Sequence, residues 1–262
     1  MKHRILGLVG AAALVAGLAV ASTGTAGASS WNYGGGGTLA PSANLNLVHG
    51  IPGLAVDIYV VKNFNIFQAK ELSDVTFGTA ADLNTALPGF ITPGFYIIDI
   101  VGHGGNPFKP VLLTSTYLGA GQSKTAVAYI SASTVGVAGA PTLTVFNNNV
   151  TATNGQARVS VAHTAVAPTV GVCADGSVPL VPAFSNGQQA TAVVPAGSYS
   201  VTVTAPNNCS TVLAGPIGPV ALAADTTTLV YAIGTYPSTF TVASLVVPNN
   251  STPSIPGWGG HI

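Results

Sequence analysis

An internal repeat constrains the fold of this 262-residue chain more than any other feature. The stretch Asn44–His49 reappears 114 residues later as Arg158–His163. A second strand-like stretch follows each copy, at Val56–Tyr59 and at Val170–Cys173. The order of these landmarks is the same in both halves, which indicates one module present twice. Later landmarks are only 97 residues apart, so the first copy is 17 residues longer.

Alternation of apolar and polar residues predicts strands in both copies. In 199–204, tyrosine and valine alternate with serine and threonine, and Leu229, Tyr231 and Ile233 repeat the pattern. A period of two is expected where one face of a strand is buried. Each copy gives about seven short strands separated by turn residues, a pattern typical of a two-sheet sandwich. We therefore predict an all-β protein of two tandem immunoglobulin-like antiparallel β-sandwich domains.

The predicted segments follow from the repeat and from composition shifts along the chain. They are a signal peptide at 1–28, a Gly-rich flexible segment at 29–42, β-sandwich domain 1 at 43–147, a linker at 148–156, β-sandwich domain 2 at 157–247 and a Pro/Gly/Ser tail at 248–262.

The N-terminal residues are typical of a secretory signal peptide. Lys2 to Arg4 are basic, Ile5 to Ala21 are apolar, and Ala26-Gly27-Ala28 fits the small-x-small cleavage pattern. An uncleaved membrane anchor is the alternative, since the apolar stretch is about as long as a minimal span. No later stretch is apolar for long enough to span a membrane, so we expect a secreted or cell-surface protein.

Charge is scarce in this chain, which limits its partners. Charged residues make up 5% of the sequence, and cleavage after residue 28 leaves five basic against seven acidic side chains. Nucleic acid as a partner is disfavoured because a basic patch is missing. A weakly charged surface favours self-association, to a homo-oligomer or polymer, or contact with cell-wall and glycan components. No cofactor is predicted.

Cys173 and Cys209 are the two cysteines of the chain. In an exported protein such a pair predicts a disulfide. A reactive thiol or a metal site is the alternative, but no His or further Cys stands at ligand spacing.

Two histidines, His49 and His163, occupy the same position of the module. Alternation places them on the core side of their strands, where a ring nitrogen would bind a loop carbonyl. A metal or acid–base role is the alternative, with Asp57 as the local partner, although the second copy has Gly171 at the equivalent position.

The sequence predicts no catalytic site and no metal site. Asp99 and His103 could together hold a cation beside a Gly-rich turn, but one carboxylate and one imidazole form an incomplete site, and a plain loop is the competing interpretation. Glu71 is the one glutamate, and neither a Gly-x-Ser-x-Gly nor a His-Glu-x-x-His motif is present. We therefore expect a protein that is not an enzyme.

Aromatic residues outside the regular strands are the candidate binding residues. Trp31 and Trp258 lie in the two tails, and Phe64 and Phe67 lie in 62–74, one of two places where the first copy is longer. Loop insertions on a rigid scaffold are common binding sites, and His103 joins them as a candidate. The alternatives are tails without a partner and insertions without a function.

Several stretches together resemble one known family. They are the histidine strand ends, Val56–Tyr59, Pro195–Val201 and Leu229–Gly234. They resemble the domain of unknown function numbered 4397, over nearly all of residues 43–247. The resemblance implies a bacterial, exported β-sandwich, often in tandem, and brings no catalytic residues. Gly171 departs from the pattern, in which the family and the first copy have Asp.

Two functions of different classes remain open. The first is a structural or adhesive protein of the cell surface or extracellular matrix, acting through sandwich faces, sheet edges and tails and able to self-assemble. The second is an extracellular carbohydrate- or small-ligand-binding module that uses the insertion of the first copy.

Overall fold

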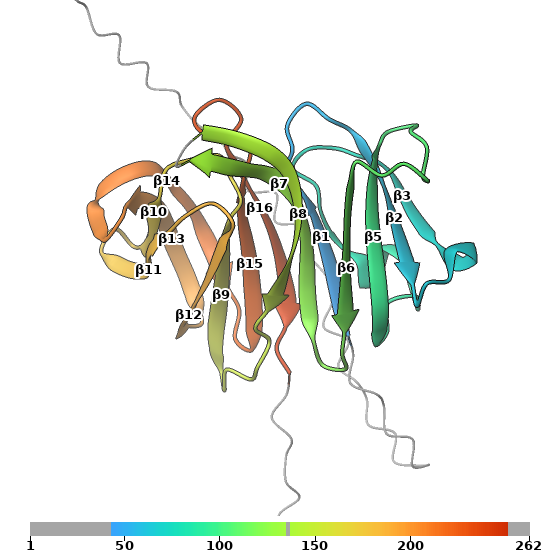
Figure 1. Cartoon of the computed structure of the whole chain (residues 1–262). Coiled ribbons are helices and arrows are strands. Elements are labelled where there is room, and N and C mark those ends of the chain that lie inside the picture. Colours follow the sequence, from blue (N-terminus) through green and yellow to red (C-terminus); the bar gives the residue numbers. More distant parts are fainter. Residues whose placement is uncertain (1–42, 135–136, 251–262) are drawn as a thin grey trace, which may run out of the picture.

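A computed structural model describes residues 43–134 and 137–250 (Figure 1). The predicted signal peptide, the Gly-rich segment and residues 251–262 of the tail lie outside the described residues, and so do Trp31 and Trp258. The described chain consists of strands and the turns between them, with almost no helix, and forms two sandwich-like units, which confirms the predicted fold class.

The first unit has two four-stranded sheets, in the orders β4-β1-β7-β8 and β3-β2-β5-β6. One turn of helix, α1 (Leu83–Ala86), follows Asp82, whose side chain accepts a hydrogen bond from the Asn84 amide and caps it. A short 3-10 turn, η1, covers Ile66–Gln68. The strands are β1 (Asn44–His49), β2 (Val56–Lys62), β3 (Lys70–Val75), β4 (Ala80–Asp82), β5 (Gly94–Gly102), β6 (Leu112–Leu118), β7 (Ser123–Thr134) and β8 (Val137–Asn148).

The second unit repeats this topology strand for strand. Its sheets have the orders β12-β9-β15-β16 and β11-β10-β13-β14, and β9 pairs with β15 in parallel, as β1 does with β7. All other pairings are antiparallel. The strands are β9 (Gln156–His163), β10 (Val170–Ala174), β11 (Val178–Phe184), β12 (Gln188–Pro195), β13 (Gly197–Ala205), β14 (Asn208–Leu222), β15 (Thr226–Ile233) and β16 (Thr241–Pro248).

The pairing registers refine the alignment of the two copies. His49 lies opposite Ala128 and His163 opposite Ala232, and these alanines in turn pair with Leu143 and Val242. The last strands are therefore offset by 99 residues, and the first copy is 15 residues longer, so the expected 17 was wrong. The 62–74 stretch is also not all insertion, because it contains β3.

Each unit has its own hydrophobic core between its two sheets. Leu45 and Leu47 of β1 face Ile58 and Ile98 in the first unit. Val159 and Val161 of β9 occupy the same places in the second unit. The alternation read from the sequence therefore identifies the inward faces correctly, including the face that carries the two histidines.

A third core joins the two units, which the sequence did not predict. The outward faces of the two inner sheets pack against each other, so that the four sheets form successive layers (Figure 1). Leu229, Tyr231 and Ile233 lie in this shared core and not in the core of the second unit. The expectation of two independent cores was wrong because alternation shows that a face is buried, but not what covers it.

Polar contacts add to this junction. The long β7–β8 hairpin reaches over the second unit, where Asn186 accepts a hydrogen bond from the Ala132 amide and donates one to the Ile130 carbonyl. Buried Arg158 donates from its guanidinium to the carbonyl groups of Asn149 and Thr151 in the connection between the units. The connection is thus held at both ends and is part of the junction.

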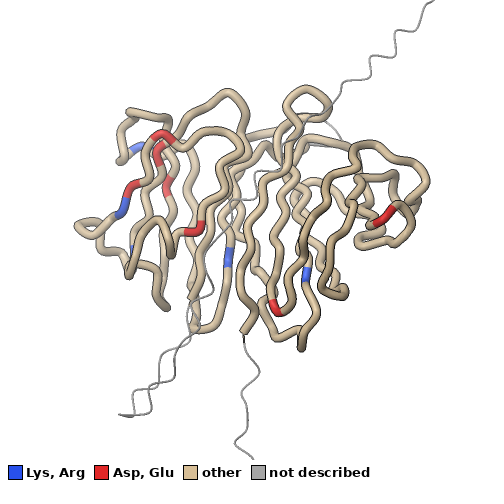
Figure 2. Tube along the Cα trace, turned by 180° about the vertical axis from the view of Figure 1, so that it is seen from behind, with Lys and Arg blue, Asp and Glu red and all other residues tan. Residues whose placement is uncertain are grey.

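Charged residues are distributed unevenly between the units. Figure 2 shows most of them at the outer end of the first unit, whereas the second unit carries only Arg158, Asp175 and Asp225 among its described residues. No helix within the described residues is both long and apolar enough to span a membrane.

Candidate binding face

The outer face of the β3-β2-β5-β6 sheet gathers most of the candidate residues. Phe95, Ile97 and Asp99 of β5 point away from the core, because Tyr96, Ile98 and Ile100 point into it. Across the sheet, Phe95 pairs with Tyr117 and Asp99 pairs with Leu113. We call this surface, with the loops beside it, the outer face of the first unit.

Phe64 lies over this face and is held by a tight turn. Asn63 and Phe64 both have positive φ angles, of 49° and 60°. The Asn63 side chain accepts a hydrogen bond from the Phe95 amide at 3.0 Å, which fixes the turn against β5. The Phe64 ring then stacks on the Phe95 ring with centroids 4.8 Å apart. A non-glycine residue in the left-handed region costs free energy, so the turn holds Phe64 at the expense of local strain.

Phe67 is the most exposed large hydrophobic side chain of the described residues, with 95% of its surface accessible. It lies in η1, beside exposed Ile66. Phe108 and Val111, in the loop between β5 and β6, are exposed as well. Exposed apolar side chains therefore lie at both ends of this face, and exposed apolar surface marks an interaction site in many soluble proteins.

His103 pairs with Asp57 and not with Asp99, so the Asp99–His103 cation site, which the sequence offered only as an alternative to a plain loop, does not form. The Nδ1 atom of His103 lies 2.8 Å from Asp57 Oδ1. Asp57 also accepts hydrogen bonds from the amides of Gly104 and Asp74. The His103 hydrogen bond, followed by the two amides, lowers the pKa of Asp57 to about 2, and Asp57 raises the pKa of His103. Asp57 therefore organises two loops at one end of the face.

Asp99 is left without a charged partner on the apolar surface. Its Oδ1 atom is buried and makes no hydrogen bond. Burial raises the pKa of its carboxyl group. A carboxylate that is partly desolvated and unpaired is able to accept a hydrogen bond from a bound hydroxyl group.

His49 and His163 have the predicted structural contacts. Their Nε2 atoms lie 2.8 Å from the Leu54 carbonyl oxygen and 2.9 Å from the Pro168 carbonyl oxygen, respectively. Each Nε2–H donates to its carbonyl, so Nδ1 is left as an acceptor, and in both residues it has no partner. Asp57 is not a partner of His49, contrary to that alternative.

The free energy of unfolding should fall as the pH decreases from about 7.5 to about 5.5. Burial lowers the pKa of His49 and of His163 below the ordinary 6.5, so below that pH the unfolded chain binds protons that the folded chain excludes. His103 acts in the opposite sense, because its raised pKa gives stability that is present below 6.5 and lost at higher pH. Urea midpoints across this range would measure the slope.

Two variants provide controls for this pH dependence. His163→Gln should make the decline shallower, and His103→Asn should make it steeper. A midpoint that does not change between these pH values would contradict the buried, neutral state of the two core histidines.

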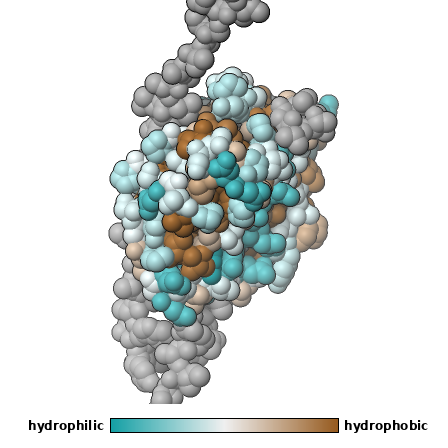
Figure 3. Space-filling view, turned by 90° about the vertical axis from the view of Figure 1, so that its left-hand side faces the viewer, coloured by the Kyte–Doolittle hydropathy of each residue, from teal (hydrophilic) through white to brown (hydrophobic). Residues whose placement is uncertain are grey.

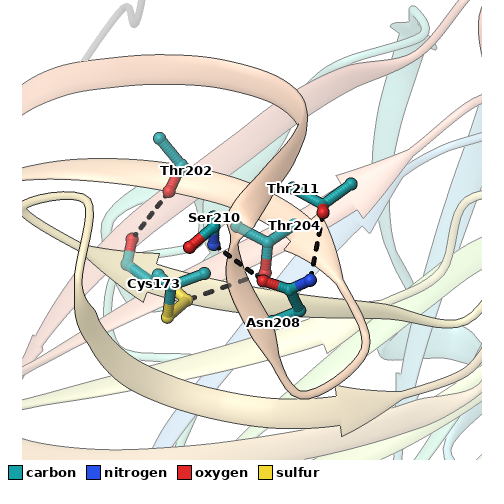
Figure 4. The surroundings of a disulfide bond; sticks show 7 residues. Cys173, Thr202, Thr204, Asn208, Ser210 and Thr211 are labelled. Atoms are coloured by element: carbon teal, nitrogen blue, oxygen red, sulfur yellow. Dashed lines mark hydrogen bonds between the residues drawn. A yellow bond between two sulfur atoms is a disulfide. The ribbon is translucent and has the colours of Figure 1, made fainter.

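The predicted disulfide between Cys173 and Cys209 is present, with the Cα atoms 5.7 Å apart. It lies on the outer side of β10, where the Thr202 hydroxyl donates to the Cys173 carbonyl and the Thr204 hydroxyl lies 3.6 Å from the Cys173 sulfur (Figure 4). The bond ties the start of β14 to β10 across β13. It therefore fixes an edge strand and does not cross between the two sheets.

The outer end of the second unit is a weaker candidate surface. Val178, Val193 and Val212 are exposed there or on its flanks, but Figure 3 shows hydrophobic surface broken up by polar side chains. Within 43–134 and 137–250, no three His, Cys, Asp or Glu side chains are grouped so that they could hold a metal ion.

Comparisons with known proteins do not assign this chain to a family. The chain matches no described protein family, so the resemblance to the domain family numbered 4397 stays a prediction. It also matches no curated protein. Two solved structures are similar, both of candidate cell adhesion proteins, from Bacteroides ovatus and from Bacteroides uniformis. The first is 10% identical with a TM-score of 0.26, the second 12% identical with a TM-score of 0.26, and each match covers 80% of this chain and 99% of the other.

Proposed function

We propose that the protein is an exported, non-catalytic adhesive protein of the bacterial cell surface or its surroundings, and that the outer face of the first unit is its contact surface. The exposed aromatic group of Phe64, Phe67 and Tyr117 on a rigid sheet carries this proposal. The disulfide supports it, because disulfides persist in oxidising, extracytoplasmic compartments.

A carbohydrate-binding module is the second candidate, favoured by one specific feature. The stacked rings of Phe64 and Phe95 lie on the same face as Asp99, whose Oδ1 atom has no hydrogen-bond partner. Aromatic rings offer an apolar platform, and a carboxylate accepts hydrogen bonds from hydroxyl groups. A sugar presents both kinds of surface, so a glycan of the cell wall would be a suitable adhesive target.

The double variant Phe64→Ala/Phe67→Ala should reduce binding to a bacterial cell-wall fraction at least about tenfold, because truncation of central aromatic side chains removes much of the energy of an interface. Co-sedimentation with the cell-wall fraction and a glycan array would measure the loss. Val178→Ala, a truncation of an exposed apolar side chain of the second unit, is the control for position and should leave binding unchanged.

Sedimentation velocity of the purified protein would separate the two candidates. Self-association that Phe64→Ala/Phe67→Ala abolishes supports adhesion between copies, and binding to defined glycans by a monomer supports the carbohydrate module. A protein that stays monomeric at high concentration and binds neither cell wall nor glycan would overturn the proposed function.

A further inference from the structure

The core of the second unit contains a cavity of about 250 Å³ between its two sheets. Val159 and Val161 of β9 line one wall, and Val201 and Val203 of β13 line the other. At the edge of the sandwich the cavity is bordered by residues of both β14 and β16. In the first unit the equivalent strands, β6 and β8, lie beside each other and close this edge.

Smaller side chains on the two facing sheets contribute to this space, together with the edge at which β14 and β16 lie apart. At five aligned core positions that line the cavity, valine replaces a leucine or isoleucine of the first unit, with one carbon fewer each time. Other aligned lining positions go the other way: Val230 stands against Ala126, Phe184 against Val75 and Ile217 against Thr114. The five pairs are Leu45 and Val159, Leu47 and Val161, Ile58 and Val172, Ile98 and Val201, and Ile100 and Val203. Protein cores are normally close-packed, so a cavity of this size in one of two copies of the same module calls for an explanation.

The wall of the cavity specifies an uncharged occupant. None of its lining residues is Asp, Glu, Lys or Arg, so the burial of a charge would not be compensated. Two buried polar atoms in the wall, Thr228 Oγ1 and His163 Nδ1, have no hydrogen-bond partner. The His49 Nδ1 atom is also unpartnered, so the histidine atom alone is not specific to the cavity. The unpartnered Thr228 Oγ1 atom is specific to the second unit. Its counterpart in the first unit, Lys124, donates a hydrogen bond to the Thr116 hydroxyl.

We propose that this cavity binds a compact, uncharged and mainly apolar molecule with one hydroxyl group, which hydrogen-bonds to Thr228. Apolar cavities stay dry and take up apolar molecules, and one of about 150 Å³ already holds benzene. About 250 Å³ therefore suits a two-ring molecule. Exposed Leu213, Tyr236 and Val246 belong to the lining and form the rim through which it would enter.

Fluorescence titration of the purified protein with 1-naphthylamine, an uncharged two-ring fluorophore, tests the cavity. Saturable binding is expected for the natural sequence. Val201→Ile/Val203→Ile restores the residues of the first unit, so it should weaken binding at least about tenfold while the melting temperature stays the same or rises. Val161→Leu fills the cavity from the opposite sheet and is the second test. Val193→Ile, an exposed position outside the lining, is the matched control and should bind normally.

Displacement of this probe by 1-naphthol and by naphthalene tests the hydroxyl group. The natural sequence should prefer 1-naphthol by roughly three- to tenfold, as expected for one net hydrogen bond. Thr228→Val keeps the shape of the side chain and should remove this preference, with binding of naphthalene unchanged.

Three results would overturn the proposal. The first is no saturable binding by the natural sequence, and the second is equal binding by the filled variants. The third is dissociation of an oligomer by the probe in sedimentation velocity, which would assign the cavity to a segment of a second copy. Equal affinity of the natural sequence for 1-naphthol and naphthalene would remove the role of Thr228.

Discussion

Replacement of Cys173 and Cys209 by alanine is expected to lower the free energy of unfolding by about 4 kcal/mol. The two residues are 36 positions apart, and a closed loop of this length restricts the unfolded chain strongly. The bond also fixes β14, an edge strand whose pairing with β13 is interrupted by several register shifts. Without the bond, the beginning of β14 is held by its pairing with the end of β13, at Ala205 and Asn208.

Urea unfolding followed by circular dichroism would measure this loss. Reduction of the natural protein with dithiothreitol should reproduce it, whereas the double alanine variant should not respond to the reductant, because no other cysteine is present. A change below about 1 kcal/mol would show that β14 keeps its place through its backbone pairing alone.

Much of the fold could be predicted from the sequence because the responsible forces are local or repeated. Alternation in 199–204 identified an inward face correctly, since a strand has a side-chain period of two. The repeat predicted equivalent strands, and the structure has eight in each unit. The position of His49 and His163 at the ends of core strands was enough to predict a loop carbonyl as their partner.

Contacts between distant segments could not be predicted in this way. Asp57 and His103 are 46 residues apart, and they meet because Asp57 pairs with Val101 across β2 and β5. Only the register of that pairing brings the loop after β5 to Asp57, and composition does not encode it. Asp99 and His103 are closer along the chain, which made them the more obvious pair.

The candidate sites also combine features that local sequence predicts with features that depend on distant contacts. Phe64 and Phe67 were accessible to sequence reasoning as aromatics in a longer copy, but the stacking of Phe64 on Phe95 depends on a turn that the sequence does not reveal. The cavity had a sequence signal that went unused. An aligned comparison of the two copies shows Leu47 against Val161 and Ile100 against Val203, which predicts unfilled space in the second unit.

Leu229→Ala should lower the free energy of unfolding by about 4 to 5 kcal/mol, which is the upper part of the range for a buried leucine. Leu229 is fully buried in the core shared by the two units, together with Val48 and Val127 of the first unit. That core lies between two paired sheets whose backbones are fixed by their hydrogen-bonded registers, so it has little freedom to collapse around a cavity. The loss of stability should therefore include most of the energy of the new cavity that the smaller side chain leaves.

The shared core also predicts which strands this loss of stability affects. Hydrogen exchange of Leu229→Ala should show weaker protection of β1 and β7 in the first unit as well as of β15, because both inner sheets depend on the same contacts. The neighbouring change Val230→Ala faces the cavity, where packing is already incomplete, and it should cost less and leave the first unit protected. Equal effects of the two changes, or an effect confined to the second unit, would mean that the units are joined in sequence but stable independently.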